Sequence, residues 1–140
     1  MKSLTILIDM DDVLEDLVGC WIAELNAQHG TSVEMEDITE WRIANFFPTL
    51  TVEELYAPLF DPQMWGKLQA MPGAAENVKR LIEDGHTVRV VTATHYGNVL
   101  PKMERFLYVY PFLKWNNVII ASDKSMILGD VMIDDGVHNL

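Results

Sequence analysis

Residues 4–14 read Leu-Thr-Ile-Leu-Ile-Asp-Met-Asp-Asp-Val-Leu. The apolar run that leads up to Asp9 is rich in β-branched residues, which is typical of a buried strand. Asp11 and Asp12 follow directly, so the strand leads into a loop that carries three carboxylates together with Asp9. The run is too short for the apolar segment of a signal peptide and far too short to span a membrane. This stretch therefore predicts a central strand with acidic side chains at its carboxyl end.

The sequence changes to helical spacing after residue 15. Apolar residues from Leu17 to Leu25 recur three and four positions apart, and Gly30 is a suitable C-terminal cap for this helix. Thr51 and Glu54 form a capping-box pattern that predicts the start of a second helix. Because no strand pattern occurs between about residue 16 and residue 71, we expect residues 16–71 to form a helical cap. Residues 1–15 and 72–140 then form the core.

Helices and strands alternate in the second half of the chain. Helical patterns near residues 74–84 and 98–110 separate short apolar runs at 87–92, 118–120 and 131–133. Alternation of this kind predicts an α/β fold with a Rossmann-like, doubly wound parallel sheet.

The charge of the chain excludes several classes of function. Ten basic and twenty-one acidic residues give a net charge of −11, whereas nonspecific binders of nucleic acid or anionic membranes need a basic face. The single cysteine, Cys20, excludes an internal disulfide framework. We expect a cytoplasmic protein with a small-molecule partner and no nucleic acid or membrane partner. The composition does not predict the oligomeric state.

Polar residues follow each predicted strand of the core. In open α/β sheets, ligands bind outside the carboxyl ends of the strands. One such residue alone is more often a turn former or a solvated side chain, but here several would converge on one crevice. Because crowded carboxylates repel one another and offer only oxygen ligands, a Mg²⁺ ion is expected among them. The polar or small residues at the carboxyl ends of the three later predicted strands are Thr92, Ala93, Thr94, Ser122, Asp123, Lys124, Asp134 and Asp135.

These residues resemble the four motifs of the haloacid dehalogenase superfamily. The stretch 9–14, Asp-Met-Asp-Asp-Val-Leu, is similar to the first motif, DxDx(T/V)(L/I/V). Thr92 matches the second motif, Lys124 the third, and Asp134 with Asp135 the fourth. Within the superfamily, residues 71–74 (Met-Pro-Gly-Ala) and 123–135 resemble the 5′(3′)-deoxyribonucleotidases. The resemblance covers most of the chain and is weakest from residue 24 to residue 60.

The resemblance implies a role for each of these residues. Asp9 would be the nucleophile that forms an aspartyl phosphate, and Asp11 the general acid and base. Mg²⁺ would be held by Asp9, the Asp11 carbonyl and Asp134. Thr92, Ala93 and Lys124 would bind the phosphate, with Thr94 and Asp135 in secondary positions.

Three features depart from the family pattern. Asp12 stands where the family usually has glycine or another small residue, and Ala93 where nucleotidases often carry serine. Family members also continue beyond the fourth motif through another helix and strand, so we expect the C-terminal part of the fold to be cut short at Leu140.

The aromatic residues of the cap bear on specificity. Trp41, Phe46 and Trp65 are candidates for stacking on a nucleobase, with the interior of the cap as the alternative. We expect a Mg²⁺-dependent phosphatase that acts on deoxynucleoside monophosphates. The alternatives are a phosphatase of another small phosphate ester and a noncatalytic protein that binds metal or nucleotide.

Overall fold

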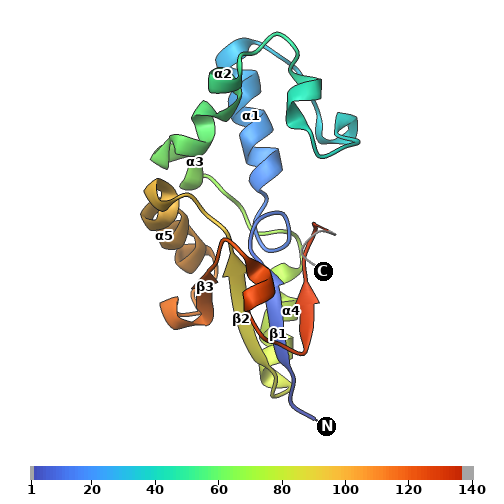
Figure 1. Ribbon diagram of the computed structural model, residues 1–140, viewed down its shortest axis with the longest axis vertical. Coiled ribbons are helices and arrows are strands. Elements are labelled where there is room, and N and C mark those ends of the chain that lie inside the picture. The colour runs from blue at the N-terminus through green and yellow to red at the C-terminus, as the bar shows by residue number, and fades with distance from the viewer. Residues whose placement is uncertain (1, 137–140) are drawn as a thin grey trace.

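The computed structural model describes residues 2–136, and its lower half is a four-stranded parallel sheet (Figure 1). The strands lie in the order β3-β2-β1-β4. This arrangement confirms the predicted α/β class. Residues 137–140, which the sequence analysis assigns to the core, lie outside the described residues. The strands are β1 (Thr5–Asp9), β2 (Thr87–Thr92), β3 (Val118–Ile120) and β4 (Val131–Ile133).

The strand order reverses beside β1, and this reversal positions the site. The chain runs outward from β1 through β2 to β3 and then returns to place β4 on the other side of β1. Ile8 pairs with Ile133 in this register, so Asp9 and Asp134 both follow at the same level of the sheet. The carboxyl ends on either side of such a reversal form a crevice in which α/β proteins bind ligands.

One apolar cluster joins the sheet to the two helices of the core, α4 (Ala74–Glu83) and α5 (Val99–Val109). Both helices lie close to where their apolar spacing predicts them, and a 3-10 turn, η4 (Tyr96–Asn98), precedes α5. Burial of these apolar side chains supplies the main stabilisation of the core. The buried members of the cluster are Ile6, Ile8, Met10, Leu14, Val78, Val88, Val90, Phe106, Tyr110 and Leu113.

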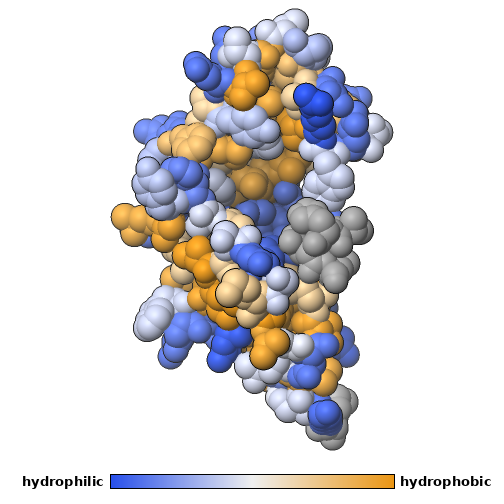
Figure 2. All heavy atoms as spheres, viewed as in Figure 1, coloured by the Kyte–Doolittle hydropathy of each residue, from blue (hydrophilic) through white to orange (hydrophobic). Residues whose placement is uncertain are grey.

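The segment between β3 and β4 contains only a 3-10 turn, η6 (Lys124–Met126), and another 3-10 turn, η5 (Trp115–Asn117), precedes β3. Gly129 packs directly on β1, because a Cβ atom there would lie 2.6 Å from Cγ of Leu7. Met126 and Leu128 of the same segment are 77% and 90% exposed. Apolar residues are therefore visible on the surface of the lower half of the molecule (Figure 2).

The cap stands above the sheet and has its own apolar cluster (Figure 1). Its helices are α1 (Leu17–His29), α2 (Val52–Tyr56) and α3 (Pro62–Trp65), with 3-10 turns η1 (Met35–Asp37), η2 (Ile43–Phe46) and η3 (Ala57–Phe60). Gly30, at φ 66°, ends α1, and the predicted capping box of Thr51 and Glu54 starts α2. The buried members of the cluster are Trp21, Ile22, Leu25, Ile43, Phe47, Leu55, Met64, Trp65 and Leu68.

Two chain segments connect the cap to the core, and they are hydrogen-bonded to each other. The amide of Asp16 donates to the carbonyl of Gln69, and the amide of Met71 donates to the carbonyl of Leu14, each at 2.9 Å. Between these bonds, Glu15 and Ala70 form an antiparallel bridge. We call these paired segments, residues 14–16 and 69–71, the hinge. No helix in the described part of the chain is long and apolar enough to cross a membrane.

Candidate active site

Charged side chains gather at the carboxyl ends of β1, β2 and β4. Asp9 and Thr92 are the last residues of β1 and β2, and Asp134 directly follows β4. Ser122 and Asp123, after β3, are exposed, whereas the structure brings together Asp9, Asp11, Thr92, Lys124 and Asp134. They form two hydrogen-bonded groups, each centred on a buried lysine.

Lys124 is the centre of the first group. Its Nζ atom donates to Oδ1 of Asp9 at 2.6 Å and to Oδ2 of Asp134 at 3.0 Å. The three side chains are almost fully buried, with Asp134 at 0% exposure. Burial lowers the pKa of Lys124, but its hydrogen bonds and charge attraction to Asp9 and Asp134 outweigh this, so the pKa is raised overall. Lys124 is therefore a fixed positive charge beside the expected nucleophile.

Three carboxylates at this end of the sheet fit a metal ion. Asp9, Asp134 and Asp135 each offer one oxygen, and these oxygens lie within 4.8 Å of one another. An all-oxygen set of this kind suits a hard divalent cation. Burial, followed by the hydrogen bond and charge of Asp9, raises the pKa of Asp135 to about 7. Asp135, expected only in a secondary position, thus joins the carboxylate set.

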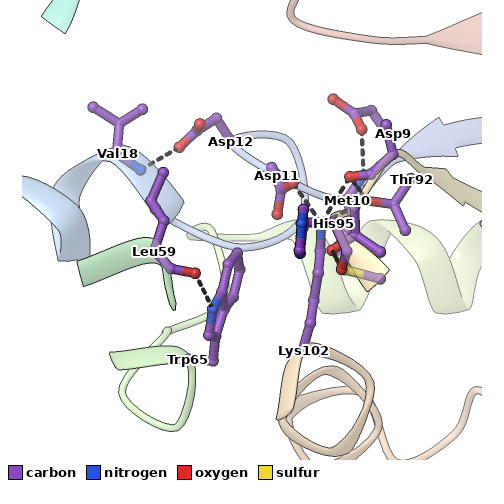
Figure 3. Close-up of polar contacts among 12 residues, drawn as sticks. Asp9, Met10, Asp11, Asp12, Val18, Leu59, Trp65, Thr92, His95 and Lys102 are labelled. Carbon is purple, nitrogen blue, oxygen red and sulfur yellow. Dashed lines mark hydrogen bonds and ion pairs between the residues drawn. The ribbon is translucent and has the colours of Figure 1, made fainter. Parts of the chain in front are cut away.

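Lys102 is the centre of the second group, and the sequence analysis missed it. Its Nζ atom donates to Oδ2 of Asp11 at 2.7 Å, to Oγ1 of Thr92 at 2.8 Å and to the carbonyl of Ala93 at 3.3 Å. Figure 3 shows this side chain extending from α5 to Asp11 and Thr92. A signal was present in the sequence, since Lys102 lies four residues before Phe106 on the apolar side of a helix. A lysine there is buried and needs a partner.

Oδ2 of Asp11 is directed to Lys102, and the Asp11 carboxylate is not part of the group formed by Asp9, Asp134 and Asp135. Burial raises its pKa, although the positive charge and hydrogen bond of Lys102 oppose the shift. Its Oδ1 atom is buried and has no hydrogen-bond partner among residues 2–136. A carboxyl group that tends to hold its proton suits a general acid.

Asp12 adopts a backbone conformation that favours glycine. Its φ of 61° is the only positive value at a non-glycine residue in the described chain. Its Oδ1 atom accepts a hydrogen bond from the amide of Val18 at 2.9 Å, near the start of α1. Burial raises the pKa of Asp12 to about 6.

A cavity of about 420 Å³ lies between the cap and the core, next to this cluster. Trp41 lines it and is 69% exposed. Trp65 instead belongs to the cap cluster, where its Nε1 atom donates to the carbonyl of Leu59, but the Lys102 ammonium lies 5.4 Å from its ring (Figure 3). Phe46 packs against the same cluster. The lining residues are Asp12, Asp16, Leu17, Val18, Trp21, Met35, Ile38, Glu40, Trp41, Ile43, Met71 and Asp135.

The loop after β2 closes one side of the site. Thr94 donates a long hydrogen bond, at 3.4 Å, to the carbonyl of His95. The ring of His95 contacts Phe60 of the cap edge-on, with centroids 5.2 Å apart. This loop therefore touches both the core and the cap.

A parallel sheet that reverses its order at β1, with acidic residues after β1 and β4 and a cap inserted after β1, defines a haloacid dehalogenase-like hydrolase. The HAD family hydrolase from Deinococcus radiodurans R1, solved with bound phosphate and sodium, shares the fold with a TM-score of 0.55. It is 16% identical, and the match covers 83% of this chain and 57% of that protein.

The family follows from closer relatives. The model of the family "5′ nucleotidase, deoxy (pyrimidine), cytosolic type C protein" matches residues 2–140. The 5′(3′)-deoxyribonucleotidase of Bacillus subtilis (strain 168) is 35% identical across all of this chain, which covers 80% of that protein. The enzyme of that name from Clostridium acetobutylicum is 27% identical, with 77% of it covered. The chain belongs to this nucleotidase family and is a phosphoric monoester hydrolase.

Proposed function

We propose that this protein is a Mg²⁺-dependent phosphatase that hydrolyses deoxynucleoside monophosphates through an aspartyl phosphate on Asp9. The observation that carries the proposal is the pair of buried lysines. Lys124 holds Asp9, and Lys102 holds Asp11 and Thr92, at the end of the sheet where a phosphate would lie. The names of the relatives supply the substrate class.

Asp9 is the nucleophile in this proposal. Its carboxylate ends a strand and is held by Lys124 and by the amide of Met10 at 2.8 Å, which restricts its orientation. An Asp9 oxygen forms a bond to phosphorus as the bond from phosphorus to the ester oxygen breaks. The phosphoryl group is then covalently attached to Asp9, and the alcohol leaves.

Asp11 moves the protons. In its protonated form it donates a proton to the departing ester oxygen and becomes a carboxylate. That carboxylate then accepts a proton from the water that attacks the phosphoryl group, which releases inorganic phosphate and restores both aspartates. The raised pKa of Asp11 supports the first step, because it favours the protonated form.

The two lysines and Thr92 hold the phosphoryl oxygens. Phosphoryl transfer depends mainly on positioning and on electrostatic stabilisation of the oxygens. Ammonium groups that already lie in a buried site act there at little reorganisation cost. Together with the proposed Mg²⁺, they account for how a chain with a net charge of −11 would attract an anion, since the positive charge is supplied locally.

Asp9, Asp134 and Asp135, with the carbonyl of Asp11, are the proposed ligands of Mg²⁺. When bound, the ion supplies positive charge that offsets the charge of the phosphate. The choice of Mg²⁺ rests on the oxygen-only ligand set. We propose that the protein acts on this substrate in the cytoplasm, the compartment that the sequence analysis expects.

A substrate screen tests the proposal. Purified protein is incubated with the deoxynucleoside monophosphates, ribonucleotides and sugar phosphates, with Mg²⁺ or with a chelator, and released phosphate is measured. We expect the highest kcat/KM with a deoxynucleoside monophosphate, activity only with the metal, and none in Asp9→Asn. Equal or better turnover of a sugar phosphate would reject the nucleotide assignment and favour a phosphatase of another small ester.

A further inference from the structure

All described charged residues that line the cavity between cap and core are acidic. Among the described residues that line it, four are acidic and none is lysine, arginine or histidine. The remaining lining residues are apolar, including the indole rings of Trp21 and Trp41. A ligand in this cavity would therefore meet apolar walls and negative charge together. The acidic lining residues are Asp12, Asp16, Glu40 and Asp135.

Asp12 occupies its place in the cavity wall at a conformational cost. At φ 61°, glycine carries no penalty, whereas a residue with a Cβ atom is disfavoured. Among residues with a Cβ atom, aspartate and asparagine adopt this conformation most readily. Oδ1 of Asp12 binds the amide of Val18, and Oδ1 of Asp16 binds the amide of Gly19 at 2.8 Å. Both carboxylates are thus held in fixed positions.

The phosphate-binding end of the site, unlike the cavity, contains ammonium groups beside its carboxylates. Lys102 and Lys124 place two buried ammonium groups beside Asp11 and Asp9. Asp12 and Asp135, which line the cavity, are the sequence neighbours of Asp11 and Asp134. A substrate that spans the site would therefore lie with one end at the two lysines and the other in a cavity whose described charged residues are all acidic.

We propose that Asp12, supported by Asp16, makes the cavity select phosphate monoesters whose leaving group carries no second anionic group. This inference rests on the proposed function and specifies its substrate class. Nucleoside monophosphates and esters of amino alcohols would be accepted, because their leaving groups are neutral or positive. Nucleoside bisphosphates would be rejected, because either phosphate at the lysines leaves the other in the acidic cavity.

The physical basis is repulsion between like charges in a partly buried space. The repulsion between two like charges weakens with their separation and with screening by solvent. Unfavourable pairs of like charges are a common source of specificity, because they act against the wrong partner. One carboxylate is therefore expected to change discrimination on the order of tenfold.

The test compares a 2′-deoxynucleoside 5′-monophosphate with its 3′,5′-bisphosphate, which has the same base and sugar. The kcat/KM values of both are measured at pH 8 for the wild type, Asp12→Asn, Asp16→Asn and Glu53→Gln. Asparagine tolerates positive φ and keeps an oxygen for the amide of Val18, so Asp12→Asn removes little except the charge. Glu53 is an exposed cap residue outside the cavity lining and controls for net charge.

We expect the wild type to prefer the monophosphate, and Asp12→Asn to reduce that preference about tenfold, mainly through a lower KM for the bisphosphate. Asp16→Asn should have a smaller effect in the same direction, and Glu53→Gln none. Equal preference in the wild type and Asp12→Asn would overturn the proposal. So would an equal change in Glu53→Gln.

A second pair of substrates separates this inference from the nucleotide assignment. Choline phosphate and 3,3-dimethylbutyl phosphate have the same shape, but only the first has a positive leaving group. We expect Asp12→Asn to reduce the choline-to-dimethylbutyl ratio of kcat/KM even if no nucleotide is hydrolysed. An unchanged ratio contradicts selection by charge, whereas a lack of nucleotide turnover alone rejects only the proposed substrate.

Discussion

At the scale of single residues, the site is organised by two lysines that divide the acidic residues between them. Lys124 binds Asp9 and Asp134, and Lys102 binds Asp11. The two aspartates of the first motif therefore have different partners, although they are two positions apart. That difference is the structural basis for giving them different chemical roles.

The roles of Asp9 and Asp11 can be separated with two substrates. Asp9→Asn should be inactive and form no phosphoenzyme, because the covalent route needs its carboxylate. Asp11→Asn should be slowed by about 10²–10⁴-fold on an alkyl phosphate, but much less on an aryl phosphate whose leaving group needs no proton. Rapid-quench assays with both esters measure this. Equal loss on both esters in Asp11→Asn, together with a phosphoenzyme in Asp9→Asn, would contradict the assignment.

Lys124 should compete with the metal ion. Its ammonium lies within hydrogen-bonding distance of two of the three carboxylates of the proposed metal site. Lys124→Met should therefore bind Mg²⁺ more tightly while losing hydrolytic activity. Calorimetric titration of Mg²⁺ measures the affinity, and Lys79→Met, a change at an exposed position of α4, is the matched control. Weaker binding of Mg²⁺ in Lys124→Met than in the control would show that the lysine supports the metal instead.

At the scale of elements, the hinge contains a fully buried ionisable side chain. The side chain of Glu15 is fully buried, and neither of its oxygens has a hydrogen-bond partner among the described residues. Burial, followed by the negative charge of Asp11, raises the pKa of Glu15 from 4.5 to about 7. The element that joins cap and core therefore contains a carboxyl group that is most stable when it is neutral.

This pKa predicts that stability falls as pH rises. Below pH 4.5 Glu15 is protonated in both the folded and the unfolded chain, so it imposes no penalty. Between pH 4.5 and about 7 only the unfolded chain ionises, and folding loses roughly 3 kcal/mol over this window. Glu15→Gln should weaken this dependence, part of which the raised pKa values of Asp12 and Asp135 retain, and be the more stable protein at pH 8. Urea unfolding from pH 5 to 8 measures the free energy of unfolding of both proteins, with the exposed Glu83→Gln as control. Parallel pH profiles in the wild type and Glu15→Gln would contradict the prediction.

Sequence pattern predicted the elements well where local signals were strong. The strand at 87–92, the capping box at Thr51 and the glycine end of α1 are all found as expected, because each depends on neighbouring residues. The role of Lys102 was missed because its partners, Asp11 and Thr92, are distant in sequence. The position of Trp65 inside the cap cluster also depends on long-range packing, so spacing alone could not decide between the cap interior and a stacking position.

At the scale of the whole molecule, the sheet is unequally covered. The cluster with α4 and α5 buries one set of strand residues, while β4 pairs only with β1 within the described sheet. Val131 and Ile133 of β4 are each about two-fifths exposed, at 40% and 41%, and Met126 and Leu128 of the segment that leads into β4 are exposed as well. An apolar surface next to an open strand edge favours association between chains.

Replacement of these apolar side chains should reduce self-association. The double variant Met126→Ser and Leu128→Ser is expected to fold normally, since both residues are exposed, and to show less concentration dependence in sedimentation velocity. Leu100→Ser with Tyr108→Ser, which removes exposed apolar residues of α5, is the matched control. Equal behaviour of the two double variants would mean that the surface near β4 has no special role.

The hydrogen bonds between residues 14–16 and 69–71 also have a consequence for how such proteins diversify. The entry and exit of the cap lie side by side, with Asp16 bonded to Gln69 and Leu14 to Met71. A foreign segment whose two ends are equally close can therefore replace residues 17–68 without moving any strand of the sheet. The arrangement makes the cap an exchangeable module: grafting a relative's cap onto this sheet should transfer the relative's choice of ester while Asp9, Asp11 and both lysines stay in place.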